Sequence, residues 1–118
     1  MREPQQEVAQ GELLAWTKND QELANAHWAQ LSPPAKKLYE ILSLAPKKKV
    51  SGPKLAEKIG LENAHGVAGL TAWPGRYAYT VGRKLPLSWE KTQDGLGYYW
   101  MEEEVAQLFA KAKDAKTK

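Results

Sequence analysis

The sequence predicts an α+β chain that is mainly helical, with a β-hairpin in its C-terminal half and a final helix. Three observations support this prediction. A serine cap with a nearby proline opens two helical runs, two short helices follow each other across a tight turn, and an aromatic run comes after them. A helix-turn-helix followed at once by a hairpin is the order of elements in a winged helix-turn-helix, in which the hairpin is the wing.

Length and composition limit the classes of protein to consider. The chain has 118 residues, 42% of them hydrophobic and 26% charged, which is typical of one soluble globular domain. It contains no cysteine, which excludes disulfides, thiolate nucleophiles and cysteine-based zinc sites. No apolar run is long enough to span a membrane, and residues 1–10 are too polar for a secretory signal. We therefore expect a cytoplasmic protein that has no membrane partner.

Basic charge is concentrated in the middle of the chain. The whole chain has a net charge of +3, whereas residues 32–91 carry eleven basic and four acidic side chains, a net of +7. Such an excess suits a polyanionic partner, because each Lys or Arg that neutralises a phosphate releases counterions. A solvated, lysine-rich surface is the alternative interpretation.

The N-terminal part is expected to contribute one helix. Residues 1–18 are expected to be flexible or loosely packed. Three apolar residues would tie part of this segment to the core: Leu13, Leu14 and Trp16. Residues 19–31 carry apolar side chains at helical spacing, with Asn19 or Asp20 as the N-cap.

Two signals, each a serine cap followed within two residues by proline, predict the next helices. Ser32 precedes two prolines and opens a helix that ends before Pro46. Ser51 opens a shorter helix that ends at Gly60, in the position favoured for a left-handed residue. Asn63 then offers the N-cap of another helix, so the two short helices form a helix-turn-helix.

The segment 63–83 is expected to be the helix that enters the major groove of DNA. Pro74 lacks a backbone N–H, and its ring clashes with the carbonyl four residues earlier. We therefore expect this helix to be kinked, or divided near Ala72 and Trp73. Its outward face has almost no acid and small residues at its start, while its cations lie toward its end.

Two features of this helix have alternative interpretations. Gly66 and Gly69 either let the backbone approach another surface or allow close packing on neighbouring elements. Trp73 is either a plug between two helix pieces or an apolar contact to a thymine methyl group or a partner.

The rest of the chain predicts a hairpin over residues 86–101 and a final helix that begins near Glu102. Four aromatic residues are expected to pack in the core and the wing rather than to stack on bases: Trp28, Trp89, Tyr99 and Trp100. We assign the winged-helix domain to residues 19–112 and a Lys-rich tail to residues 113–118.

Four stretches carry a family resemblance: LSPPAKKLYEIL, VSGPKLAEKIGL, GVAGLTAWPGRYAYTVGRKLP and YYWMEEEVAQLF. On these stretches the chain resembles a group of small, uncharacterised winged-helix proteins of actinobacteria, over residues 20–112. The resemblance implies a winged-helix fold and a DNA-binding habit, and it identifies no activity, target sequence or cofactor.

We expect a transcriptional regulator that binds double-stranded DNA with segment 63–83 in the major groove and hairpin 86–101 as the wing. The candidate base contacts are His65, Trp73, Arg76 and Thr80. The candidate phosphate contacts are Lys47, Lys48, Lys49, Lys54, Arg83, Lys84 and Lys91. A homodimer would supply sequence specificity, because one small module covers few base pairs. Such a protein would localise to the nucleoid.

Two other functions use the same residues differently. In the first, the wing and the kinked helix bind an acidic protein partner and the chain does not contact nucleic acid. In the second, the chain coats the nucleoid and binds duplex DNA without reading bases.

Catalysis has little support in the sequence. No metal-ligand spacing, nucleophile elbow or phosphate-binding loop is present. His27 is expected to be a packed core residue, and His65 lies at the start of the groove-entering helix. We expect no enzyme activity, no metal, no cofactor and no small-molecule ligand.

Overall fold

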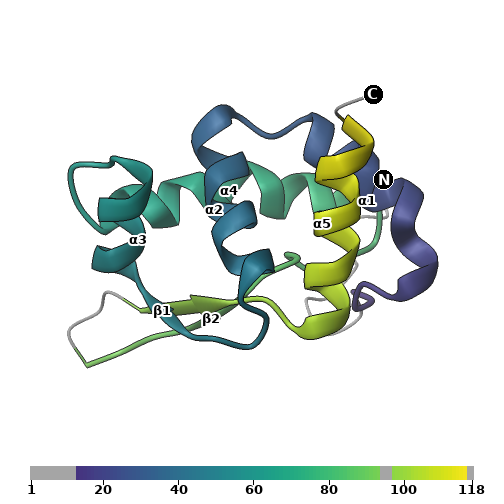
Figure 1. Cartoon of the computed structure of the whole chain (residues 1–118). Helices are drawn as coiled ribbons and strands as arrows, with labels where there is room; N and C mark the ends of the chain where they lie inside the picture. Colours follow the sequence, from purple (N-terminus) through teal and green to yellow (C-terminus); the bar gives the residue numbers. More distant parts are fainter. Residues whose placement is uncertain (1–12, 94–96, 117–118) are drawn as a thin grey trace, which may run out of the picture.

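The computed structural model describes residues 13–93 and 97–116 (Figure 1). The elements in chain order are the 3₁₀ helix η3 (Lys18–Asp20), α1 (Gln21–Ala29), α2 (Pro33–Leu44), β1 (Val50–Ser51), α3 (Gly52–Ile59), α4 (His65–Thr80), β2 (Ser88–Glu90), β3 (Tyr98–Trp100) and α5 (Glu103–Lys116). Helices therefore dominate the described residues, and a small antiparallel sheet lies along one side of them. The predicted α+β class is confirmed.

Serine side chains begin two of the helices, as the sequence predicts. Ser32 Oγ accepts a hydrogen bond from the backbone N of Ala35 at 3.4 Å, at the start of α2. Ser51 Oγ accepts one from the backbone N of Lys54 at 3.3 Å, at the start of α3. α3 ends at Gly60, whose φ of 96° is left-handed and would strain any residue with a Cβ. Gly60 thus begins the turn between α3 and α4.

α4 is one uninterrupted helix of 16 residues with Pro74 in its interior. The expected division near Ala72 and Trp73 is therefore wrong. Pro74 is buried and lines the same hollow as Leu31 and Ala35. The helix therefore continues through a buried position at which the backbone lacks a hydrogen-bond donor.

Both ends of α4 have local causes. The backbone N of His65 donates to Asn63 Oδ1 at 3.0 Å, so Asn63 caps the helix from two residues before its start. At the other end Gly82 has a φ of 75°, and the backbone N of Arg83 donates to the carbonyl of Ala78 at 2.9 Å. The helix consequently ends at Thr80, whereas the sequence predicts that it ends at residue 83.

The predicted hairpin is present and belongs to a three-stranded sheet in the order β1-β3-β2. Tyr99 of β3 pairs with Val50 of β1 on one side and with Trp89 of β2 on the other. Side chains alternate along a strand, so Tyr98 and Trp100 point to the opposite face from Tyr99. Residues 94–96 of the predicted turn lie outside the described residues.

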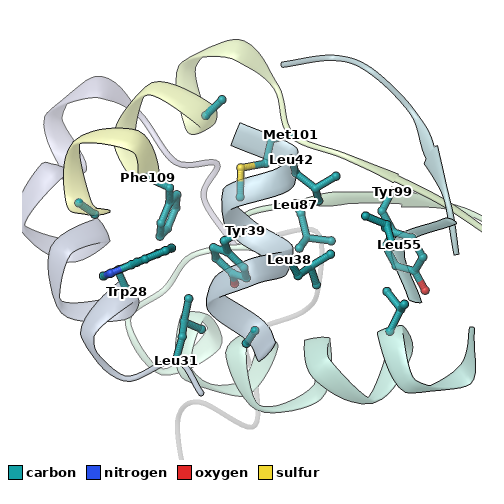
Figure 2. Packing of buried hydrophobic residues seen from close by; sticks show 14 of the residues in the cluster. Trp28, Leu31, Leu38, Tyr39, Leu42, Leu55, Leu87, Tyr99, Met101 and Phe109 are labelled. Atoms are coloured by element: carbon teal, nitrogen blue, oxygen red, sulfur yellow. The ribbon is translucent and has the colours of Figure 1, made fainter. Parts of the chain in front are cut away.

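The core lies between α1, α2 and α5 and extends to the sheet. Figure 2 shows Trp28, Tyr39 and Phe109 at one end of it and Tyr99 at the other. His27 is fully buried, and its Nε2 lies 2.7 Å from the hydroxyl oxygen of Tyr39. Burial lowers the pKa of His27 to about 4, so the imidazole is neutral at physiological pH. The prediction that His27 is a core residue is confirmed.

The segment before η3 packs beside the exit of α4. Leu13 and Trp16 are buried, whereas Leu14 is 60% exposed. Trp16 Nε1 donates to the carbonyl oxygen of Lys84 at 2.7 Å. The backbone N of Leu14 donates to the carbonyl oxygen of Gly82 at 3.0 Å. The part of segment 1–18 before Leu13 lies outside the described residues.

α5 continues beyond the predicted domain boundary. The helix runs to Lys116, and Lys113 Nζ forms an ion pair with Glu40 of α2. The expected start of the Lys-rich tail at residue 113 therefore falls inside this helix. Residues 117 and 118 lie outside the described residues.

Candidate nucleic-acid interface

The outward face of α4 brings all four candidate base contacts together. His65, Trp73, Arg76 and Thr80 are exposed. At about 100° per residue, these four positions fall within an arc of roughly 80° around the helix axis, and Gly69 falls within the same arc. We call these five residues the α4 stripe.

No acidic side chain lies on the α4 stripe, because α4 contains neither Asp nor Glu. Arg76 forms no ion pair with any residue that the structure describes. Thr80 Oγ1 donates to the carbonyl of Tyr77 at 2.6 Å and can still accept a hydrogen bond. Two acids, Glu57 and Glu62, line a hollow beside His65 at the N-terminal end of the stripe. Most of the stripe is therefore open to an anionic partner.

The two glycines of α4 have different surroundings. A Cβ at Gly66 would lie 3.1 Å from Leu61 Cδ1, so this glycine allows close packing on the turn after α3. A Cβ at Gly69 would meet no atom within 4 Å. Close packing on neighbouring elements thus accounts for Gly66 but not for Gly69. The bare backbone at Gly69 remains available to an external surface.

Trp73 lies on the surface of an undivided helix. Its side chain is 40% exposed and stacks on Tyr77, with ring centroids 5.3 Å apart and an interplanar angle of 18°. Because α4 has no separate pieces, the interpretation of Trp73 as a plug between them is wrong. Its contact to a thymine methyl group or a partner stays a prediction.

A cavity of about 340 Å³ lies between the first half of α4 and the sheet. Its lining residues are Ala64, His65, Ala68, Thr71, Leu85, Trp89 and Tyr99. Burial raises the pKa of Tyr99, so its hydroxyl stays protonated at neutral pH. The cavity connects the α4 stripe to the base of the hairpin through His65.

Trp89 lines this cavity, and the sequence did not single it out as a site residue. It is 52% exposed, whereas the sequence predicted that it packs within the core or the wing. Leu87 is buried at 4% exposure, so β2 leaves the core between these two residues. Alternation along the strand predicts their common face, but it does not predict where the core ends.

Arg83 forms an ion pair instead of extending toward solvent. Its Nε donates to Asp20 Oδ2 at 3.0 Å, and its Nη2 donates to Asp20 Oδ1 at 2.9 Å. The hydrogen bonds from Arg83 hold the pKa of the Asp20 carboxyl below its ordinary value, although burial acts in the opposite direction. The same hydrogen bonds raise the pKa of Arg83. This pair is a structural contact between the exit of α4 and the start of α1.

Two of the candidate phosphate contacts adjoin the elements of this interface. Lys84 follows the exit of α4, and Lys91 continues β2 into the hairpin. Both side chains are exposed. They flank the surface formed by the α4 stripe and the hairpin.

The other candidate phosphate contacts lie elsewhere. A groove of about 620 Å³ between α2, β1 and α3, which we call the lysine groove, is lined by Lys48, Lys49, Lys54 and Lys58. Tyr98 also lines this groove, whereas Tyr99 lines the cavity beside α4. Residues of β1 line the groove and Trp89 of β2 lines the cavity, so the two hollows lie toward opposite edges of the β1-β3-β2 sheet. Lys47 is exposed in the loop before β1, with a φ of 68°. The structure therefore does not join these lysines to the α4 stripe.

Two classes of site receive no support within the described ranges 13–93 and 97–116. No three His, Asp or Glu side chains gather there as metal ligands. None of the helices in these ranges is long and apolar enough to cross a membrane.

Comparison with known families gives one match. Residues 21–116 match the model of DUF6416, a family of unknown function. The match covers most of the chain, and the chain belongs to this family. No curated protein matches the chain significantly, and neither does any solved structure.

Proposed function

We propose that this member of the DUF6416 family is a winged-helix protein that binds duplex DNA and regulates transcription. In this proposal α3 and α4 form the helix-turn-helix, α4 enters the major groove, and the hairpin of β2 and β3 is the wing.

The order and pairing of the elements support the winged-helix part of the proposal. α2, β1, α3 and α4 are followed directly by β2 and β3, and β1 pairs with β3 to complete the sheet (Figure 1). Residues of α4, β2 and β3 line one cavity, and this proximity of the hairpin to α4 supports a role for the hairpin as the wing. The short turn at Gly60 is typical of a helix-turn-helix.

The observation that carries the DNA-binding part is the α4 stripe. It is an exposed, acid-free surface on the second helix of the motif, and it contains an arginine that no described carboxylate neutralises. Surface helices commonly carry both charge signs on their solvated face, so a face of this composition is better suited to an anionic partner than to water.

The chemistry of the stripe suggests a role for each residue. The fork of the Arg76 guanidinium matches the N7 and O6 acceptors of guanine, and the Trp73 ring offers an apolar contact to a thymine methyl group. His65 and Thr80 can hydrogen-bond to base edges. The bare backbone at Gly69 lets the helix approach the groove closely. Lys84 and Lys91 would contact phosphates and set the register of the protein on the duplex.

A matched pair of variants tests the proposal. The Arg76→Ala variant should lose roughly 1–3 kcal/mol of binding free energy for a preferred duplex, measured by fluorescence anisotropy. Lys111→Ala removes one positive charge from an exposed position of α5 and should change the affinity little. Equal affinities of the two variants would remove Arg76 from the site, and failure of the wild-type chain to bind any duplex at low salt would overturn the proposal.

A further inference from the structure

The lysine groove is a second charged surface, separate from the α4 stripe. Four lysines line it, and none of its described lining residues is acidic. Its floor comes from the C-terminal end of α2 and from β1, and α3 forms one wall. Lys54 and Lys58 are one helical turn apart on α3, so their ammonium groups project along the same wall.

Most of the positive charge in the groove is not neutralised. Lys49 Nζ lies 2.8 Å from Glu90 Oε1 and 5.0 Å from the centroid of the Trp100 ring. Lys48, Lys54 and Lys58 form no ion pair with any residue in the described ranges. The groove therefore holds three lysines whose charges are available to a partner.

Apolar side chains are exposed in the same groove. Leu44 is 74% exposed and Tyr98 is 40% exposed, and both line it together with Ile41. Leu44 is the most exposed large hydrophobic residue among those that the structure describes. An apolar residue surrounded by lysines gains from a partner that removes it from water and also supplies negative charge.

This combination distinguishes the groove from a phosphate-binding surface. Phosphates would engage the lysines but would leave Leu44 and Tyr98 without an apolar contact. The groove lies toward the β1 edge of the sheet and shares no described lining residue with the cavity beside α4, which lies toward the β2 edge, so a duplex on the α4 stripe would not occupy it. An acidic polypeptide with an apolar side chain satisfies both kinds of lining residue.

We propose that the lysine groove docks an acidic segment of a partner protein, with an apolar side chain of that segment placed against Leu44 and its carboxylates paired with Lys48, Lys54 and Lys58. This interaction is independent of DNA binding. A protein that uses both surfaces would hold an acidic partner and a duplex at the same time.

A peptide selection tests this proposal without involving DNA. Short random peptides displayed on phage are selected against the full chain at low salt, and the retained peptides are sequenced. We expect enrichment of Asp and Glu around a Leu, Ile, Met or Phe. One retained peptide is then synthesised with a fluorescein label and titrated with the wild-type chain and with groove variants.

The groove variants should weaken the binding of this peptide in a defined order. Charge reversal by Lys54→Glu with Lys58→Glu should lower the affinity by about tenfold or more, and Leu44→Ala should lower it by about threefold to tenfold. Lys111→Glu, the matched control on α5, should lower it by less than about twofold. Thermal unfolding followed by circular dichroism confirms that each variant is folded.

Three results would overturn the proposal. The first is a retained set of peptides with no enrichment of acidic residues. The second is equal peptide affinity of the wild-type chain and the folded groove variants. The third is a loss of duplex affinity in the groove variants as large as that of Arg76→Ala, which would make the groove part of a nucleic-acid surface. If the chain binds peptide in the groove but binds no duplex, the DNA-binding function proposed for α4 is contradicted, whereas the docking proposal stands.

Discussion

Arg83 donates two hydrogen bonds to the carboxylate of Asp20, from Nε to Oδ2 at 3.0 Å and from Nη2 to Oδ1 at 2.9 Å. Oδ2 of the same carboxylate accepts a third hydrogen bond, from the backbone N of Thr17 at 2.9 Å. One acidic group thus joins the turn before α1 to the segment that follows α4. The exit of α4, and with it the position of the helix that we propose enters DNA, depends on this pair.

Replacing Arg83 should destabilise the fold. In Arg83→Ala the nearly buried Asp20 carboxylate loses its cation, and we expect the free energy of unfolding in urea to fall by about 2 kcal/mol. Lys84→Ala is the matched control, because it removes a positive charge from the next, exposed position, and it should change stability by less than about 0.5 kcal/mol. Equal stability of the two variants would show that the Asp20–Arg83 pair contributes nothing to the fold.

The buried imidazole of His27 should make stability depend on pH. The folded chain holds its pKa at about 4, below the ordinary value of 6.5, because burial disfavours the cation. The unfolded chain therefore binds the proton more readily, and the contribution of His27 is fully present above pH 6.5. It is lost as the pH falls toward 4, up to about 3 kcal/mol.

Two variants check the origin of this pH dependence. In His27→Phe, urea unfolding measured between pH 6.5 and pH 4 should show a smaller decrease in stability than in the wild-type chain. Tyr39→Phe removes the hydroxyl that bonds His27 but leaves the imidazole buried, so the decrease should remain. A decrease in His27→Phe as large as that of the wild-type chain would assign it to other groups.

Gly69 should show opposite effects on stability and on DNA binding. Since a Cβ there would meet no atom within 4 Å, Gly69→Ala should raise the free energy of unfolding by about 0.5–1 kcal/mol through helix propensity. The added methyl group would also stand between α4 and the floor of the major groove, so duplex affinity should fall several-fold.

Gly75→Ala is the matched control for Gly69→Ala. Its Cβ would make an ordinary contact of 3.7 Å with Leu85 Cδ1, and the position lies outside the α4 stripe. This variant should be stabilised to a similar extent and should keep its affinity for DNA. If Gly69→Ala also keeps its affinity, the backbone at residue 69 does not face the groove.

Local signals predicted the elements of the fold well. The caps at Ser32 and Ser51, the left-handed Gly60 and the hairpin depend on a few neighbouring residues, and the structure contains all of them. The division expected at Pro74 was wrong because only the local effect of proline on a helix was considered. Pro74 is buried inside the continuous helix α4, and burial depends on residues far apart in the sequence.

The sequence predicted only the part of the candidate site that lies on a single helix. Helical periodicity alone placed His65, Trp73, Arg76 and Thr80 on a common face. The lysines of the central block were grouped with them because they share a charge and a stretch of sequence. Their separation follows from the order of the strands, in which β1 beside the lysine groove and β2 beside the α4 cavity form opposite edges of the sheet, and no local pattern encodes this order.

The central claim is that the α4 stripe binds duplex DNA. The most direct test is to select duplexes from a random-sequence pool with the full chain at two salt concentrations and to sequence the retained fraction. We predict binding that weakens steeply with salt, together with an enriched motif that is lost in Arg76→Ala. Absence of binding at the lower salt concentration would contradict the claim that the α4 stripe is a DNA-binding surface.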